Sequence, residues 1–411
     1  MTETIAIVGA SLAGGRAAEA MRRAGFDGRV ILIGEESWLP YERPPLSKVV
    51  LWDQTGLPAN FFLHDEAWYA ANRIELRLGV RVEALDLADG GIRLATGESL
   101  AADRILLATG ARARRLPLAG ADMANVCHLR TKDEAERLRA ALRPGVRLVV
   151  IGMGIIGAEV AASASKIGCA VTVIEPAAAP MIRAIGARFG RWLGGRHEAR
   201  GVRARFGVAV TRLIVDAGGV RAIECTDGAR IDCDVVVVGI GIIPNTDLAR
   251  GAGLETDNGI VVDRQGRTSH RHVFAAGDVA AQPGFFGGRA RLETYQNAAD
   301  QAAAAGAAMS GRDADYCRPG WFWSDQYDLH IQGVGRIDDG LPTTVRGDPE
   351  TESFSAFFLD DGVVVGAVTV NRTAEMSVAR RLVERRLAPH PGALADPSVS
   401  LRDLLRHRDG G

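Results

Sequence analysis

The chain is 411 residues long, with a hydrophobic fraction of 47%, a charged fraction of 24% and a formal net charge of -1 at pH 7. This length exceeds one ordinary hydrophobic core, so we expect a globular protein of two or three domains. The balanced charge argues against a general nucleic-acid-binding protein, although a local basic patch stays possible.

The cysteines and the apolar runs indicate a reduced, cytoplasmic protein. The five cysteines are scattered and never form a C-x-x-C pair, which favours free thiols and indicates neither a metal site nor dithiol catalysis. The first apolar strand begins almost at the initiator methionine, so we expect no signal peptide. The longest apolar run, residues 235–243, is too short to span a bilayer.

The N-terminal stretch has the pattern of a dinucleotide-binding βαβ unit. An apolar strand over residues 5–8 is followed by a glycine turn, a helix over 16–24 and a second strand over 30–34. The start of that helix would direct unpaired N–H groups at a pyrophosphate. Glu35 closes the second strand, where a carboxylate accepts hydrogen bonds from both ribose hydroxyls.

The glycine turn of this unit departs from the usual pattern at one position. Gly9 lets the chain turn sharply out of the strand, and Gly14 lets helix and strand pack closely. The middle glycine of G-x-G-x-x-G is replaced by Ser11, whose small side chain is expected to admit a phosphate and to donate to it. Taken alone, this motif is a weak signal.

The next segment contains two adjacent prolines, Pro44 and Pro45, which predict a stiff loop and no helix. Arg43 and Lys48 flank them just downstream of the predicted phosphate site. We favour a role for both cations at that site over the alternative of a solvated loop. Further along, the strand from 104 stops at Thr109 and Gly110, which would bring backbone groups near the nucleotide.

A second βαβ unit begins at residue 146 and carries an intact G-x-G-x-x-G. Strands are predicted over 148–151 and 170–174, with a helix over 158–167 between them. The acidic residue after the second strand would accept both ribose hydroxyls and repel a 2′-phosphate, which favours NADH over NADPH. A buried strand over 235–238 then leads into a glycine-containing turn. The residues expected to contact this cofactor are Gly152, Gly154, Ile155, Ile156, Gly157, Glu175 and Gly241.

Two dinucleotide sites in one chain imply a tightly held FAD and an exchangeable nicotinamide. A strand from 273 ends in Gly277-Asp278, and Asp278 could accept hydrogen bonds from the ribityl chain of FAD. The alanine-rich helix over 297–309 could place its N-terminus at the flavin edge that gathers negative charge on reduction, although simple close packing also explains its composition. We therefore assign FAD to the first unit and NADH to the second.

The last ninety or so residues carry no nucleotide motif. An aromatic cluster occupies 321–326, and residues 354–370 predict two antiparallel strands that turn at 360–362. A helix with four arginines follows. A solvated helix face is the simpler interpretation of these arginines, and a docking patch for an acidic partner is the alternative.

Taken together, these motifs resemble the FAD- and NADH-dependent ferredoxin reductases of the glutathione-reductase fold. The resemblance covers nearly the whole chain, and its most specific parts are Arg-Pro-Pro-Leu-Ser-Lys (43–48) and Trp-Phe-Trp-Ser-Asp-Gln (321–326). It implies an α/β protein with two Rossmann-like domains and a C-terminal α+β domain. The implied FAD-binding domain is discontinuous (1–112 and 245–320), followed by NAD-binding (113–244) and C-terminal (321–411) domains.

The same resemblance implies the site residues and the reaction. In such enzymes Lys48 and Glu159 would form an ion pair beside the flavin, and Trp323 would lie against its ring. NADH would give hydride to FAD, which would pass single electrons to a [2Fe–2S] ferredoxin serving a cytochrome P450 or a Rieske oxygenase. Arg183 would contact NADH. The further residues implied for FAD are Ala13, Glu35, Lys48, Val82, Arg130, Asp278 and Tyr295, and we add Arg43, Thr109 and Gly110.

Two other functions compete with this prediction. A thiol-disulfide reductase of the same fold needs a cysteine after the first βαβ unit, where this chain has Tyr41 to Lys48 and no cysteine. A flavoprotein resembling apoptosis-inducing factor, whose redox state controls binding, is opposed by the balanced charge and the lack of a long basic tail. Slow NADH oxidation with a stable charge-transfer complex would favour that binding role.

Overall fold

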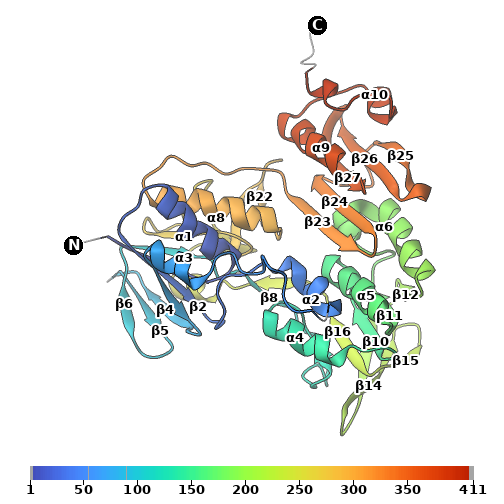
Figure 1. The fold of residues 1–411 in the computed structure, drawn as a ribbon, viewed down its shortest axis with the longest axis horizontal. Coiled ribbons are helices and arrows are strands. Elements are labelled where there is room, and N and C mark those ends of the chain that lie inside the picture. The colour runs from blue at the N-terminus through green and yellow to red at the C-terminus, as the bar shows by residue number, and fades with distance from the viewer. Residues whose placement is uncertain (1–2, 54, 89, 407–411) are drawn as a thin grey trace. The chain divides into compact units, whose positions relative to one another are not determined.

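A computed structural model describes residues 3–53, 55–88 and 90–406 (Figure 1). The chain divides into two compact units, each built from three separate segments. The first unit comprises Met1–Glu42, Ala59–Arg112 and Ile243–Gly320. The second comprises Arg43–Pro58, Ala113–Ile242 and Trp321–Gly411. Unlike the division expected from the sequence, residues 43–58 pack with the second unit, and so does the C-terminal region.

The first unit is organised around a parallel sheet of order β20-β7-β1-β2-β3. Four of its strands are mainly apolar because helices or further strands cover both faces of the sheet, whereas the edge strand β3 alternates apolar and charged residues. They are β1 (Thr4–Val8), β2 (Arg29–Gly34), β3 (Ile74–Leu78), β7 (Arg104–Leu107) and β20 (Val273–Ala275).

Two helices rich in alanine and glycine, α1 (Leu12–Arg23) and α8 (Tyr295–Met309), lie side by side on this sheet (Figure 1). They approach closely, since a Cβ added at Gly306 would lie 2.6 Å from the carbonyl oxygen of Ala17. The sequence predicted that this first helix would begin at residue 16, but α1 begins four residues earlier, at Leu12. The small side chains keep both helix starts at the same edge of the sheet.

Two small sheets, one antiparallel and one mixed, and short helices complete the first unit. One sheet contains β4 (Val82–Asp86), β5 (Gly91–Leu94) and β6 (Ser99–Ala101). Another contains β18 (Thr256–Asp257), β19 (Gly259–Val261), β21 (Ala280–Pro283) and β22 (Arg289–Ala290). The short helices are α3 (Glu66–Ala71) and α7 (Asp247–Gly251). Two of the five passages of the chain between the units lie within β8 (Ala111–Ala113) and β17 (Ile242–Pro244).

The second unit contains its own parallel sheet, of order β12-β11-β10-β16-β9. The strands are β9 (Val126–Cys127), β10 (Arg147–Ile151), β11 (Ala170–Glu175), β12 (Arg203–Phe206) and β16 (Val235–Val238). The helices are α4 (Lys132–Ala141), α5 (Ile155–Ile167) and α6 (Ile182–Ala199). A three-stranded antiparallel sheet follows α6 in the chain: β13 (Val210–Asp216), β14 (Gly219–Cys225) and β15 (Arg230–Asp232).

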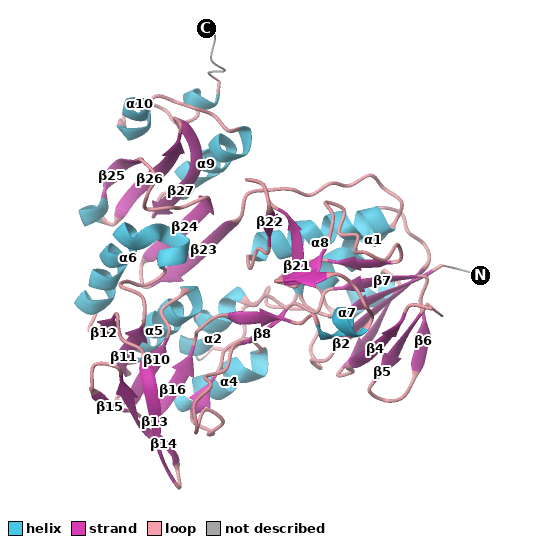
Figure 2. Ribbon diagram, turned by 180° about the vertical axis from the view of Figure 1, so that it is seen from behind, coloured by secondary structure: helices cyan, strands magenta, loops and turns pink. Residues whose placement is uncertain are grey.

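The C-terminal region folds as an antiparallel sheet of order β23-β24-β27-β26-β25 with helices (Figure 2). Its elements are β23 (Trp321–Gln326), β24 (Leu329–Gly335), β25 (Thr343–Asp348), β26 (Ser353–Asp360), β27 (Val363–Val370), α9 (Thr373–Arg385) and α10 (Pro391–Ala395), with 3₁₀ turns η2 (Pro349–Thr351) and η3 (Asp403–Leu405).

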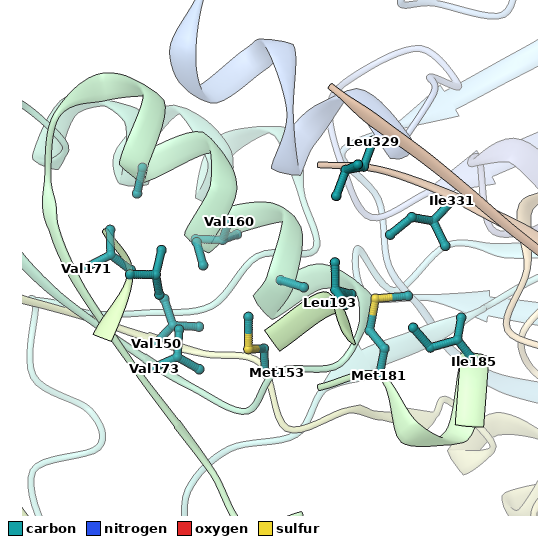
Figure 3. Packing of buried hydrophobic residues seen from close by; sticks show 14 of the residues in the cluster. Val150, Met153, Val160, Val171, Val173, Met181, Ile185, Leu193, Leu329 and Ile331 are labelled. Carbon is teal, nitrogen blue, oxygen red and sulfur yellow. The ribbon is translucent and has the colours of Figure 1, made fainter. Parts of the chain in front are cut away.

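The inner side of this C-terminal sheet shares one hydrophobic core with the parallel sheet of the second unit. Leu329 and Ile331 of β24 belong to the same cluster as Val150 of β10 and Leu193 of α6. Figure 3 shows these side chains in the cluster, with Leu193 beside Met181 and Val150 beside Val173. This shared core explains why the C-terminal region belongs to the same compact unit as the second βαβ fold.

The prediction that the two prolines exclude a helix is wrong. Pro44–Ser47 form a 3₁₀ turn, η1, and Val49–Trp52 form a short helix, α2. The prolines occupy the first positions of η1, where their fixed φ suits a helical turn and no backbone N–H is needed. Among the described residues, no helix is long and apolar enough to cross a membrane.

Candidate functional site

The first glycine turn has the close backbone packing that a nucleotide-binding turn requires. Gly9 has a φ of +119°, and a Cβ there would lie 2.1 Å from the carbonyl oxygen of Ala108. A Cβ at Gly14 would lie 1.9 Å from the carbonyl oxygen of Gly9. Ser11 is the N-cap of α1, whose first turn carries no acidic residue. The start of α1 thus keeps the electropositive character that favours an anion.

Three segments that are distant in sequence meet beside this helix start. A Cβ at Gly277 would lie 3.0 Å from the Cβ of Ala13 and 3.7 Å from that of Ala298, so the Gly277-Asp278 turn lies against the starts of both α1 and α8. Asp278 is half-buried, and Glu35 is exposed directly after β2. The glycine turn, Glu35 and the Gly277-Asp278 turn therefore line one edge of the parallel sheet, at the carboxyl ends of its strands, whereas Arg43, Lys48 and Arg130, which were also predicted for FAD, belong to the second unit.

Buried amide side chains, which the sequence analysis did not identify, hold this edge together. Gln301 accepts a hydrogen bond from the backbone N–H of Gly277 at 2.8 Å and donates to Gln282 at 2.7 Å. Gln282 in turn donates to Asn297 at 2.8 Å. All three side chains are 2% exposed, so every bond in the series is protected from water. The series fixes the Gly-Asp turn relative to α8.

The remaining predicted residues of the first unit occupy defined positions. Thr109 donates to the carbonyl of Asn245 at 2.8 Å, and Asn245 donates back to the carbonyl of Thr109 at 2.8 Å, next to Gly110. Val82 is buried at the start of β4. The phenol of Tyr295 donates to Glu42 at 2.7 Å. Burial raises the pKa of both the Glu42 carboxyl and the Tyr295 phenol.

The second glycine turn repeats the first and adds an open position. A Cβ at Gly157 would lie 2.0 Å from the carbonyl oxygen of Gly152, whose φ is +90°. A Cβ at Gly154, by contrast, would meet nothing within 4 Å. Ile155 and Ile156 begin α5, whose first turn also carries no acidic residue. The turn therefore leaves room for a phosphate in front of the N-terminus of α5.

Glu175 is positioned by this turn. Its carboxylate accepts hydrogen bonds from the backbone N–H groups of Met153 at 2.7 Å and Ala177 at 2.8 Å, and it stays half-buried. Arg183 is exposed on the first turn of α6. Gly241 has a φ of +100° and follows β16. A carboxylate oriented by two backbone donors at the end of a parallel strand suits the binding of ribose hydroxyls.

Within the second unit, Lys48 and Glu159 form an ion pair. The ammonium Nζ of Lys48 lies 3.1 Å from Oε1 of Glu159, and the carboxylate is 2% exposed. Burial raises the pKa of the Glu159 carboxyl, while Lys48 and the hydroxyl groups of Ser47 and Ser324 oppose that rise. Oδ2 of Asp325 also lies near the ammonium, at 3.9 Å. Lys48 therefore has one buried carboxylate beside it and a second, more distant one that is more accessible to water.

Trp323 lies close to this ion pair. The Lys48 ammonium is 5.9 Å from the centre of the Trp323 ring, and the indole stacks on Trp321 with ring centres 5.4 Å apart. The guanidinium of Arg380 on α9 lies 4.7 Å from the centre of the Trp321 ring. Two indoles and two cations thus form a continuous stack from α9 to Lys48.

Arg43 and Arg130 are also brought together in the second unit. The guanidinium of Arg43 donates a hydrogen bond to the backbone carbonyl of Arg130, and the N–H of Arg130 donates to Glu134 at 2.8 Å. Thr131 and Glu134 form a capping box at the start of α4. The structure thus ties η1 to α4, which the sequence did not indicate.

Four polar residues near Glu159 were missed by the sequence analysis: Ser47, Ser324, Gln326 and His197. Ser47, Ser324 and Gln326 lie inside the two motifs, 43–48 and 321–326, that carry the family resemblance, and this position could have identified them as site residues. His197 lies in no motif, and no local pattern pointed to it.

Comparisons with known proteins match the whole chain. The family model for pyridine nucleotide-disulphide oxidoreductases matches residues 3–302, and that for the reductase C-terminal domain matches residues 321–405. The chain is 42% identical over 407 residues to the ferredoxin–NAD(+) reductase component of the biphenyl dioxygenase system of Paraburkholderia xenovorans (strain LB400), covering 99% of both chains.

Solved structures are similar over the same length. The putidaredoxin reductase–putidaredoxin covalent complex matches with a TM-score of 0.94 and 35% identity, covering 98% of each chain. The ferredoxin reductase for the CYP199A2 system from Rhodopseudomonas palustris matches with a TM-score of 0.94 and 37% identity, covering 98% of this chain and 99% of that one.

Proposed function

The chain belongs to the pyridine nucleotide-disulphide oxidoreductase family, and from this premise we propose that it is an NADH-dependent flavoprotein ferredoxin reductase. It takes electrons from NADH and passes them to a [2Fe–2S] ferredoxin. The observation that carries this proposal is the pair of glycine turns, one in each unit. Each turn lies between a buried parallel strand and the start of a helix whose first turn has no acidic residue, and a carboxylate stands at the end of the next strand.

We assign FAD to the first unit and NADH to the second. The first unit adds the Gly277-Asp278 turn and the start of α8 to its glycine turn, which gives it the longer binding surface that a tightly held FAD needs. The second unit offers one glycine turn and Glu175, which suits a cofactor that must leave after each turnover. The negative charge of Glu175 disfavours a 2′-phosphate and so favours NADH.

Bound FAD supplies the chemistry, by accepting hydride from NADH and giving single electrons to the ferredoxin. The residues of the protein bind the cofactors, orient them and tune the charge around them. The N–H groups at the starts of α1 and α5 bind pyrophosphate, and Glu35 and Glu175 accept ribose hydroxyls. Lys48 would supply positive charge to offset the negative charge that reduction adds, Glu159 would hold Lys48 in place, and Trp323 would lie against the flavin ring.

Dithiol chemistry has no support from the cysteines, despite the family name. All five are free, and Cys127, Cys169, Cys225 and Cys233 have raised thiol pKa values because of burial. The pKa of Cys233 reaches about 11. Thiols with raised pKa values are poor nucleophiles near neutral pH because the thiolate is scarce. This supports electron transfer to a separate protein over reduction of a disulfide.

The partner and the compartment complete the proposal. Relatives named as reductase components of dioxygenase systems, and the reductase named for a CYP199A2 system, support a ferredoxin that serves a Rieske oxygenase or a cytochrome P450. The free cysteines support a cytoplasmic location.

The test is an absorbance spectrum followed by reduction. The purified protein should show the bands of bound flavin, NADH should bleach them, and NADH-dependent reduction of cytochrome c should require an added [2Fe–2S] ferredoxin. A colourless protein that fails to take up FAD would contradict the proposal. A flavoprotein that NADH reduces only slowly, with a stable charge-transfer band, would favour a redox-controlled binding role instead.

A further inference from the structure

A continuous series of buried side chains links α6 to Glu159 inside the second unit. Ser324 and Gln326 lie two residues apart on β23, so both side chains point to the same buried face of the strand. Ser324 lies 2.7 Å from Oε1 of Glu159, and Gln326 lies 2.9 Å from Ser324. Gln326 also contacts His197 at 2.8 Å, and His197 contacts Tyr327 at 3.0 Å. Glu159, Ser324, Gln326 and His197 are each at most 2% exposed.

Met181 identifies the orientation of the Gln326 amide, and the contact with His197 holds the amide in that orientation. The amide nitrogen lies 3.2 Å from Sδ of Met181, and a thioether sulfur has no proton to donate. The nitrogen of Gln326, and not its oxygen, must therefore face Met181 and Ser324. The amide oxygen then faces Nε2 of His197, so that nitrogen carries the proton.

The tautomer of His197 sets the direction of the last bond. Burial lowers the pKa of His197 to about 4, so the ring is neutral near pH 7 and its Nδ1 can only accept. Burial also raises the pKa of Tyr327 to about 12, so the phenol keeps its proton and donates it to Nδ1. Tyr327 thus donates to His197, His197 donates to Gln326, and Gln326 donates to Ser324, so every hydrogen bond of the series points toward Glu159.

The series ends on an acceptor. Because Ser324 accepts from Gln326, its own proton is directed at Oε1 of Glu159, while Ser47 donates to Oε2 and Lys48 donates to Oε1. A proton on Oε1 of Glu159 would compete with the protons of Ser324 and Lys48, and a proton on Oε2 would compete with that of Ser47. When Glu159 is ionised, the buried donors and acceptors of the series all have partners; when it is protonated, donors compete for the same oxygen. The series therefore favours the ionised form of Glu159.

We propose that His197 is a positioning residue for the reaction centre: through Gln326 and Ser324 it holds Glu159 as a carboxylate, which in turn fixes the ammonium of Lys48. His197 touches neither Lys48 nor a substrate in this scheme. Its contribution to turnover rests on the proposed function, because it acts on the charge that Lys48 supplies. Its effect on Glu159 does not depend on that function and can be measured separately.

The charged groups around the series are few. Lys48 faces Glu159 directly, and Asp325, which is paired with His330, lies 3.9 Å from Lys48. Arg200, the C-cap of α6, acts on His197 and is itself paired with Asp328 and Glu352. We expect these groups to stay in place when His197 is substituted, so a change in the protonation of Glu159 would report on the hydrogen-bonded series.

The experiment is an infrared pH titration of the purified full-length flavoprotein in its oxidised state. The carbonyl stretch of protonated Glu159 is assigned by its loss in Glu159→Gln. In His197→Phe, which keeps a ring but removes both hydrogen bonds, the midpoint for protonation of Glu159 should rise by about one pH unit. His197→Gln, which keeps an N–H donor near the position of Nε2, should restore most of the wild-type midpoint.

Trp192→Phe is the matched control. Trp192 is also on α6 and donates to the carbonyl of Pro349 at 2.9 Å, so its loss weakens contacts of the same helix without touching the series. Its Glu159 midpoint should equal that of the wild type. An equal midpoint in His197→Phe and Trp192→Phe would overturn the proposal.

A second variant keeps the test decisive if His197→Phe does not fold. Tyr327→Phe removes the terminal donor and should raise the midpoint in the same direction by a smaller amount; an unchanged midpoint would overturn the proposal. If the protein binds flavin but fails to reduce any ferredoxin, the proposed function fails while the titration still decides the role of His197.

Discussion

Lys48 and Glu159 form an ion pair of 3.1 Å in which the carboxylate is almost completely buried, at 2% exposure. The ammonium is the charged group that opposes the burial-induced rise in the pKa of Glu159. A buried pair of this kind costs desolvation free energy and is weak evidence for stability by itself. Lys48 lies in the segment 43–48, one of the two most specific parts of the family resemblance, which supports the role in electron transfer that we propose for it over a role in stability.

Lys48→Met should lower the rate constant for flavin reduction by NADH about tenfold to a hundredfold, because one charge-assisted interaction with the reduced cofactor is lost. Stopped-flow absorbance measures this rate. Lys166→Met is the control: Lys166 lies 3.1 Å from the centre of the Trp52 ring and is exposed, so its loss should leave the rate unchanged. Equal rates for wild type and Lys48→Met would remove Lys48 from the site.

Glu175→Ala should raise the KM for NADH about tenfold and leave the flavin content unchanged, because the ribose hydroxyls lose their acceptor. The reciprocal variant, Glu35→Ala, should weaken FAD retention and leave the KM for NADH near its wild-type value. Steady-state kinetics and the flavin-to-protein absorbance ratio measure both. If Glu175→Ala lost FAD instead, the two cofactors would have been assigned to the wrong units.

Gly157→Ala and Gly154→Ala should separate folding from cofactor binding in the second turn. A Cβ at Gly157 would lie 2.0 Å from a backbone oxygen, so we expect a loss of roughly 2–4 kcal/mol in the free energy of unfolding. A Cβ at Gly154 meets nothing within 4 Å, so stability should be kept while the KM for NADH rises severalfold. Thermal unfolding and steady-state kinetics measure the two effects. An unchanged KM in Gly154→Ala would mean that no phosphate approaches this position.

The burial of His197 should make the protein acid-sensitive. Its pKa falls from 6.5 to about 4 on folding, so between these values the unfolded state binds a proton that the folded state does not. The free energy of unfolding should therefore fall as the pH drops from 6.5 to 4, by up to about 3 kcal/mol. Urea unfolding at several pH values measures this slope. In His197→Gln the slope should be shallower, and an identical slope would show that other groups cause it.

Arg381→Glu should lower kcat/KM for the ferredoxin about threefold to tenfold at low ionic strength, and the difference should narrow as salt is added. Arg381 is exposed on α9, whereas Arg380 lies over Trp321 and is a poorer choice because its loss would disturb packing. Arg203→Glu, an exposed charge reversal on β12, is the control. If kcat/KM for the ferredoxin depended on salt as it does in the wild type, the arginines of α9 would be interpreted as a solvated helix face.

The local parts of the fold were predictable because their signals lie within a few residues of one another. The strands at β1, β2, β10 and β11 follow from apolar runs, and the hairpin of β26 and β27 follows from two such runs separated by a turn at 360–362. The starts of α1 and α5 were predicted too late in the chain, because the residues that directly follow a glycine turn show no apolar periodicity that would mark them as helical. The proline turn η1 was missed because proline opposes a helix interior but suits its first positions.

The sequence by itself determined the two nucleotide-binding turns, their terminal carboxylates and the family, because each depends on glycine and charge at short, regular spacing. The tertiary structure alone decided what surrounds Glu159. Ser47 and Ser324 reach it from 112 and 165 residues away, and His197 acts on it through Gln326. Such contacts depend on how β23, α5 and α6 pack, and buried polar groups must find partners wherever that packing leaves them.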